Sequence, residues 1–198
     1  MYKLEFQHIR IQEVGVLSTK TGNLLFKDPC EPKYDKATDV LQAPFGNWRV
    51  HLIETNIRKY GLFTVGCILQ HEASKTEVFP SILTQRWRSR LSGSIKSSMF
   101  SVVNESDFYA EVPAAIKEKY DTPFAPLENW YDWCRQETNH APIGFINGGC
   151  VMSKFEFGNH FNVLTPSYGK EKALFIGIEF FHRDGREFQS IFNTKGSV

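Results

Sequence analysis

The segment from Arg86 to Arg90 is the part of this sequence whose residue types best suit a binding site. It reads Arg-Trp-Arg-Ser-Arg, and Lys96 follows it. A guanidinium group binds an anion through paired hydrogen bonds, and an indole ring offers a face for stacking. We therefore predict that Arg86, Trp87, Arg88 and Arg90 bind a small anionic ligand or an acidic patch of a partner protein. The competing interpretation is a surface segment with Trp87 buried and the arginines in solvent.

Cys150 and His160 are the pair that would support nucleophilic chemistry. A nucleophilic enzyme needs a thiol or hydroxyl with a base beside it. Cys150 follows two glycines, so we expect it to be the most exposed cysteine, and a hairpin would let it face His160. A chance pairing is the simpler explanation, because the chain has 4 Cys and 6 His. We expect four free, mostly structural thiols, with Cys67 buried in an apolar run.

No metal or cofactor site is predicted. His51, His71, His160 and His182 have no spacing that indicates a shared ligand set. The acidic residues between positions 107 and 132 are expected to form the solvated face of two helices. The glycine-rich phosphate-binding motifs and the common hydrolase motifs are absent from the sequence. Together these features favour binding without catalysis.

The composition indicates one globular domain over residues 1–198. Hydrophobic residues make up 41%, and the 23 Lys and Arg nearly balance the 22 Asp and Glu. The resulting net charge of +1 argues against general nucleic-acid binding, which needs a basic surface. No apolar run approaches the roughly 20 residues of a membrane span. Residues 1–8 lack the apolar stretch of a secretory signal, so we expect a cytoplasmic protein with no membrane contact.

Sheet is the dominant secondary structure that the sequence predicts. Aromatic residues make up 14% of the chain, including 17 Phe, and they suit a pleated, half-buried surface. Residues 27–44 are expected to form a loop, Asp184-Gly185 a hairpin turn and residues 194–198 a frayed tail. Strands are predicted over residues 3–17, 24–26, 48–54, 62–69, 144–152, 155–164 and 173–181. We predict an α+β fold of mostly antiparallel sheet in two halves, arranged as a sandwich or a curved sheet.

A short insert of two helices is predicted near residues 110–137. The first covers residues 110–120, with Pro113 in its first turn, and the second covers 127–137. The residues expected to point inward are Ala114, Ala115, Ile116 and Tyr120 in the first helix, and Leu127, Trp130, Tyr131 and Cys134 in the second. Residues 81–98 are also expected to be helical, with an interruption at 92–94.

Two stretches of the sequence match at a constant offset. Phe45-Gly46-Asn47 recurs as Phe157-Gly158-Asn159, and Leu62-Phe63 recurs as Leu174-Phe175. Each stretch runs from Gly-Asn through a strand and a polar turn into an apolar strand. The match predicts two similar β-hairpins.

Six segments occur in an order that resembles a known family. They are residues 24–29, 46–50, 62–69, 101–104, and 153–161 followed by 173–180. This order is similar to the bacterial domain-of-unknown-function family numbered 4241, which has a "C-D-P" turn, a "G-x-Y-P-V" strand, a central "V-D-x-G" segment and a late glycine-rich turn. Asn104 and Phe157 stand where that family has Asp. The resemblance implies a β-rich architecture and no established activity.

The function we expect from the sequence is binding rather than catalysis. The first hypothesis is a protein that captures or neutralises a partner protein, as immunity proteins do. The alternatives are a binder of an anionic, nucleotide-type signal through Arg86 to Arg90, and a hydrolase that uses Cys150 and His160. Uncovered sheet edges also make a homodimer reasonable.

Overall fold

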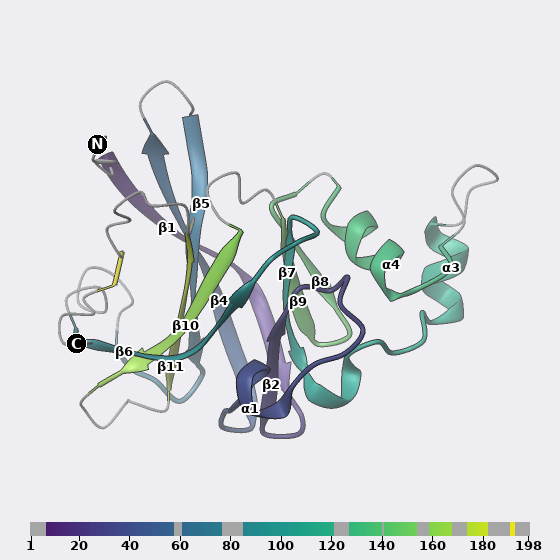
Figure 1. Cartoon of the computed structure of the whole chain (residues 1–198), viewed down its shortest axis with the longest axis horizontal. Coiled ribbons are helices and arrows are strands. Elements are labelled where there is room, and N and C mark those ends of the chain that lie inside the picture. Colours follow the sequence, from purple (N-terminus) through teal and green to yellow (C-terminus); the bar gives the residue numbers. More distant parts are fainter. Residues whose placement is uncertain are drawn as a thin grey trace.

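Two antiparallel sheets build the protein (Figure 1). The computed structural model describes residues 7–57, 61–76, 85–120, 127–139, 141–153, 159–167, 174–181 and 191–192. Sheet A has the strand order β1 (Gln7–Thr19), β4 (Gly46–Ile57), β5 (Gly61–His71), β11 (Phe175–Phe181), β10 (His160–Pro166) and β6 (Trp87–Ser94). Sheet B has the order β3 (Val40–Gln42), β2 (Asn23–Lys27), β7 (Met99–Asn104), β9 (Gly149–Ser153) and β8 (Ile143–Ile146).

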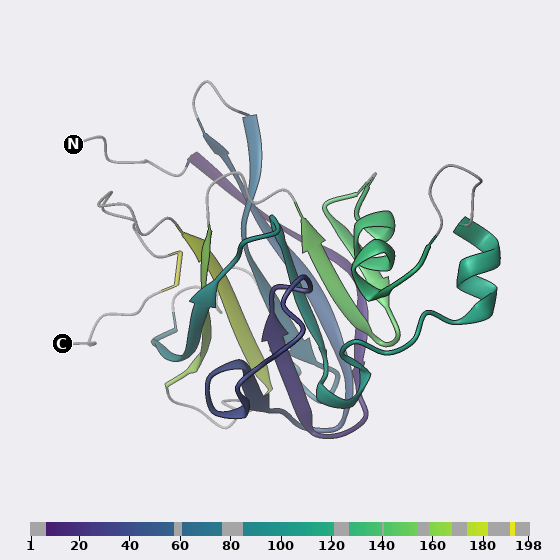
Figure 2. The ribbon, with the colours of Figure 1, turned by 45° about the vertical axis from the view of Figure 1, so that its right-hand side comes forward.

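The helices are short and lie mainly beside sheet B. They are α1 (Lys36–Asp39), the 3-10 turn η1 (Glu105–Asp107), α3 (Ala114–Tyr120) and α4 (Trp130–Glu137). Figures 1 and 2 show α3 and α4 on the side of sheet B that faces away from sheet A. The predicted α+β fold, mostly antiparallel sheet with a helical insert, is confirmed. Within the described ranges, no helix has the length and apolar character to cross a membrane.

The main core fills the space between the inner faces of the two sheets. Along β4, the side chains of Trp48, Val50 and Leu52 point inward and are 0–2% exposed, as the two-residue period of a strand requires. Phe100 of sheet B packs against Phe161 of sheet A, with ring centroids 4.6 Å apart. Burial of each such side chain contributes about 1.5–3 kcal/mol to folding, so this interior holds the sheets face to face.

The two stretches that match in sequence lie next to each other in sheet A. β4 pairs antiparallel with β5, β10 pairs antiparallel with β11, and β5 pairs with β11 between them. The expected pairing within each half is therefore confirmed for the described strands. Phe157 and Gly158 lie outside the described residues, as do the Asp184-Gly185 turn and the 194–198 tail.

Asp28 fastens the segment that passes from sheet A to sheet B. Residues 95–98 connect β6 of sheet A to β7 of sheet B, and Asp28 follows β2. One carboxylate oxygen of Asp28 accepts the N–H groups of Lys96 (2.6 Å) and Ser97 (2.7 Å). The other accepts the Cys30 N–H (2.8 Å) and the Ser97 hydroxyl (2.6 Å). Asp28 is 0% exposed, so these four bonds replace the water that the charge has lost.

Asn104 fastens a second crossing, from β1 of sheet A into β2 of sheet B. Its side-chain oxygen accepts the Lys20 N–H (2.8 Å), and its amide nitrogen donates to the Ser18 carbonyl (2.9 Å) and to Asp107 (3.1 Å). A carboxylate has no N–H to donate, so an Asp at this position would lose two of these three contacts. Asn is therefore the residue that this crossing requires.

The helix expected over residues 81–98 is wrong for the described part of that segment. Residues 87–94 form strand β6, which pairs with β10, and residues 81–84 lie outside the described chain. Trp87 and Leu91 are four residues apart, which is the spacing of a helical face. In the structure, Trp87 packs on the outer face of sheet A and Leu91 on its inner face. An extra residue, Arg90, bulges opposite Val163 and reverses the alternation between them.

The helical insert is confirmed, with corrections to its buried face. Ile116 and Tyr120 of α3 are half-buried, but Ala114 and Ala115 are exposed. In α4, the buried residues are Trp130, Trp133 and Cys134, and Leu127 is buried just before the helix. The expected loop over residues 27–44 also holds α1 and β3, because the Asp35 side chain caps α1 by accepting the Ala37 N–H.

We predict that Asp28→Asn lowers the free energy of unfolding by about 2–4 kcal/mol, because the new NH₂ group would face two donors instead of accepting from them. In a chain of this size this corresponds to a fall in Tm of roughly 4–16 °C, measurable by thermal unfolding. Glu118→Gln, which removes an exposed carboxylate from α3, is the control and should melt as wild type does. Equal melting of the two variants would contradict the role of Asp28.

Candidate functional site

Three arginines line one edge of sheet A. β6 is the last strand of that sheet, and its pairing partner among the described strands is β10. Arg86, Arg88 and Arg90 are all exposed, and we call these three residues the arginine edge. β6 begins on the side of the molecule opposite α3 and α4 (Figure 1).

The arginine side chains share one face of the strand. Arg86 and Arg88 flank Trp87, so alternation directs them away from the outer face on which Trp87 packs. Arg90 is the bulged residue, and its Nε donates to the Thr165 hydroxyl (2.8 Å) on that same side. Arg88 makes no side-chain hydrogen bond or ion pair within the described part of the protein. The edge therefore presents at least one guanidinium that is available to a ligand.

Trp87 does not belong to the exposed surface. Its side chain is 2% exposed, and its ring meets Phe192 edge-to-face with centroids 4.7 Å apart. Trp87 instead anchors β6 to the outer core of sheet A. The predicted role of Trp87 as a stacking surface for a ligand is therefore wrong, and a buried Trp87 beside exposed arginines is what the competing interpretation of the sequence described.

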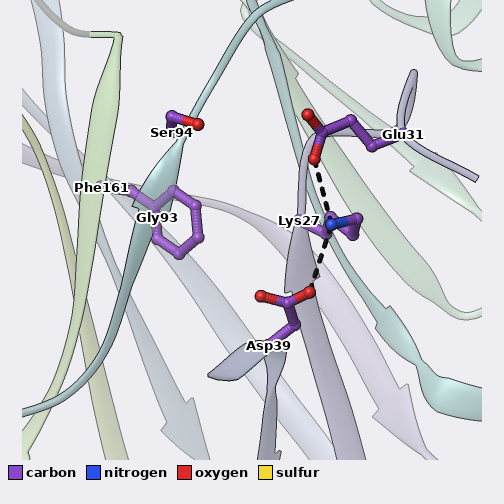
Figure 3. A pocket seen from close by; sticks show the side chains of 6 residues that line it. All are labelled: Lys27, Glu31, Asp39, Gly93, Ser94 and Phe161. Carbon is purple, nitrogen blue, oxygen red and sulfur yellow. Dashed lines mark hydrogen bonds and ion pairs between the residues drawn. The ribbon is translucent and has the colours of Figure 1, made fainter. Parts of the chain in front are cut away.

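A small pocket of about 160 Å³ lies near the other end of β6. It is lined by Lys27, Glu31, Asp39, Gly93, Ser94 and Phe161 (Figure 3). Lys27 Nζ lies 3.1 Å from Glu31 and 3.2 Å from Asp39, and Lys96 binds Glu31 at 2.5 Å. The hydrogen bond from Lys96 lowers the pKa of Glu31. Two lysines and two carboxylates therefore neutralise one another around this pocket.

The structure does not bring Cys150 and His160 into a reactive pair. Cys150 lies in sheet B with 0% exposure, and burial raises the pKa of its thiol to about 12. His160 lies in sheet A, where its Nδ1 contacts the Asn159 side chain at 2.6 Å. The expectation that Cys150 is the most exposed cysteine is wrong, because the Gly148-Gly149 turn leads into a strand that faces the core. Cys30 is the exposed cysteine, whereas Cys67 is buried as expected.

The described histidines do not come together in a metal site. His71 accepts the Ala73 N–H at Nδ1, so its Nε2 donates to the Phe45 carbonyl (2.8 Å). His51 is buried, and burial lowers its pKa. His182 lies outside the described residues. In the part of the chain that the structure describes, no three His, Cys, Asp or Glu side chains are grouped to hold a metal ion.

No protein-family model, no curated protein and no solved structure gives a significant match to this chain. The resemblance to the family numbered 4241 stays a prediction. The function is therefore inferred from the site itself.

The sequence missed the carboxylate network that positions the arginine edge. Its carboxylates all lie in the segment expected to be a loop, and they belong to Asp28, Glu31 and Asp39. Asp28 and Glu31 both contact Lys96, which is far away in the sequence. Asp39 lies in the short helix α1 and pairs with Lys27. The loop expected over residues 27–44 includes Asp28, but the hydrogen bonds that its side chain accepts from residues 96 and 97 leave no signal in the sequence.

We predict that a thiol reagent modifies Cys30 alone in the native protein. The other three cysteines are buried, and burial raises the pKa of each thiol, so the reactive thiolate is scarce at neutral pH. Mass spectrometry after native labelling should show one modified cysteine, and labelling in denaturant should show 4. Rapid native labelling of Cys150 would contradict the burial described above.

We also predict that Asn104→Asp destabilises the protein by about 2–4 kcal/mol, since a buried carboxylate would face the Ser18 carbonyl and the Asp107 carboxylate. Denaturant unfolding measures the change. Asn56→Asp makes the same substitution at an exposed position of β4 and should change stability by less than about 0.5 kcal/mol. Similar stability for both variants would show that Asn104 does not hold the crossing.

Proposed function

We propose that this protein captures a partner protein without catalysing a reaction, as immunity proteins capture toxins, and that the arginine edge binds an acidic segment of that partner. The observation that supports this most directly is the row of three exposed arginines on one face of an edge strand. Each guanidinium can hold a carboxylate through two parallel hydrogen bonds, which makes arginine a frequent anchor in protein interfaces.

A nucleotide-sized ligand is the second candidate. The volume and the charge of the pocket near Ser94 support this candidate less well than the exposed arginines support a protein partner. Small-molecule sites enclose roughly 300–1,000 Å³, whereas this pocket encloses about 160 Å³. Two of its lining side chains, Glu31 and Asp39, carry the same charge sign as a phosphate. An anionic ligand therefore has better partners at the arginine edge, which is an open surface rather than a pocket.

A hydrolase that uses Cys150 is the third candidate. Its nucleophile would be a fully buried thiol whose pKa is raised to about 12 by burial. Such a thiol carries little thiolate near neutral pH, and water and substrate have no direct access to it. The geometry of the described residues therefore supports capture over catalysis.

We predict that Arg88→Glu/Arg90→Glu weakens binding of a fluorescein-labelled polyglutamate peptide at least roughly tenfold, because hydrogen bonds to charged groups contribute about 1.5–3 kcal/mol each. Fluorescence polarisation measures the affinity. Both side chains are exposed, and the double variant loses the hydrogen bond from Arg90 to Thr165. We therefore expect its Tm to stay within a few degrees of the wild-type Tm.

The matched control is Lys117→Glu/Lys119→Glu on α3, which makes the same change in net charge at exposed positions on the opposite side of the molecule (Figure 1). This control should bind the peptide with nearly wild-type affinity. An equal loss in both double variants would mean that the peptide responds to net charge alone and would contradict a site at the arginine edge.

A further inference from the structure

We propose that the pocket near Ser94 binds a neutral, hydroxyl-rich ligand about the size of one sugar ring. This site is separate from the arginine edge, and the inference does not depend on the proposed function. The pocket lies where side chains of β6 and β10 face those of β2, of the turn after β2 and of α1 (Figure 3). Its walls, its charge, its unused hydrogen-bonding groups and its size together define the ligand.

The two walls of the pocket are fixed by contacts within the protein. On the side of sheet A, the Phe161 ring lies directly against Gly93, where a Cβ atom would stand only 2.7 Å from the ring carbons. On the other side, the Asp39 carboxylate accepts the Asp35 N–H (3.0 Å) and the Thr38 hydroxyl (3.2 Å). The pocket is therefore formed before a ligand arrives, which lowers the entropic cost of binding.

The charges around the pocket disfavour an ionic ligand. Lys27 Nζ pairs with Glu31 (3.1 Å) and Asp39 (3.2 Å), and Lys96 pairs with the other oxygen of Glu31 (2.5 Å). The two positive and two negative charges therefore cancel. An anion would meet two carboxylates and a cation would meet two ammonium groups, so either would have to break an existing ion pair. A neutral ligand avoids that cost.

The same side chains keep hydrogen-bonding capacity that they do not use on one another. An ammonium group has three N–H donors, and among the described residues Lys27 uses two of them, on Glu31 and Asp39. Each oxygen of Glu31 accepts one lysine and has room for a second hydrogen bond. Ser94 adds an exposed hydroxyl that can donate or accept. Donors and acceptors thus stand side by side, and hydroxyl groups complement both.

The size of the pocket limits the ligand to one small ring. Its volume of about 160 Å³ is room for about five water molecules at their volume in the liquid. A sugar ring carries several hydroxyl groups that can take over the hydrogen bonds of such waters, and its C–H groups can pack against Phe161. A hydroxyl that donates to a carboxylate forms a charge-assisted hydrogen bond, which is roughly twice as strong as a neutral one. A monosaccharide therefore matches this pocket.

The probes are the methyl glycosides of glucose, galactose and mannose, each titrated separately into the isotope-labelled protein while NMR follows the backbone amide signals. We expect at least one of them to bind saturably with a Kd of about 1 mM, because a ligand of this size forms only a few contacts. The shifted signals should include those of Gly93, Ser94 and Glu31. If none of the three glycosides gives saturable shifts at these residues, the proposal is overturned.

The decisive variant is Ser94→Leu, which places a larger apolar side chain at the pocket and removes no charge. Ser94 is exposed, so the variant should melt within a few degrees of wild type. We expect it to bind the glycoside at least roughly tenfold more weakly, because the added side chain occupies the space of the ligand. The matched control is Ser92→Leu, the same change at an exposed position of β6 that does not line the pocket. Equal weakening in both variants would place the sugar elsewhere and overturn the proposal.

A second variant, Glu31→Gln, tests the carboxylate without changing the shape of the pocket. It replaces a charged acceptor by a neutral one, so we expect the glycoside to bind roughly three- to tenfold more weakly. The Tm of each variant is measured alongside its affinity, so that a loss of binding is compared only between folded proteins. Wild-type affinity in both Ser94→Leu and Glu31→Gln would overturn the proposal.

The class of ligand and the independence of the two sites are tested with the same proteins. L-Alanine probes for a zwitterion and inorganic phosphate for an anion, and tighter binding of either at Gly93 and Ser94 would overturn the assignment to a neutral ligand. Arg88→Glu/Arg90→Glu leaves the lining of the pocket unchanged and should bind the glycoside as wild type does. Ser94→Leu should bind the polyglutamate peptide as wild type does. Failure of either site therefore leaves the other standing.

Discussion

The carboxylate of Asp28 is buried without exposure to water and accepts four hydrogen bonds. Three come from the segment that passes from β6 into β7, and one comes from the Cys30 N–H in the turn after β2. A buried charge is tolerated only where donors replace its hydration. The crossing between the sheets therefore has one geometry, in which Lys96 and Ser97 approach the end of β2. Because β6 leads directly into this crossing, its position at the edge of sheet A depends on Asp28.

The arginine edge follows from that placement and from one irregularity in β6. The end of the strand beside the crossing is held at Asp28, and its beginning is held by Trp87 against Phe192. The bulge at Arg90 lets Trp87 and Leu91 fill cores on opposite faces of sheet A. The strand is thus anchored on both faces by apolar side chains, while its arginines are exposed.

The sequence predicted the architecture better than the site, for physical reasons. Alternation identified β4, an apolar run identified β5, which is buried on both faces, and the i, i+4 spacing of Trp130 and Cys134 identified α4. The helix expected over residues 81–98 was wrong for residues 87–94, where the bulge at Arg90 places Trp87 and Leu91 on opposite faces of β6 and so removes the regular alternation of a strand from the sequence. The arginine cluster was found from residue types alone. The sequence offered a buried Trp87 only as the competing interpretation and could not decide for it, because its burial depends on Phe192, more than a hundred positions away.

The central claim is that the arginine edge binds an acidic segment of a partner protein, and NMR of the arginine side-chain Nε–H signals tests it most directly. Arg88 and Arg90 are exposed on β6, and Arg135 is exposed on α4. On titration with a polyglutamate peptide, the account predicts that the Nε–H signals of Arg88 and Arg90 shift, whereas that of Arg135 does not. Equal shifts of all three signals, or no shift of Arg88 and Arg90, would contradict it.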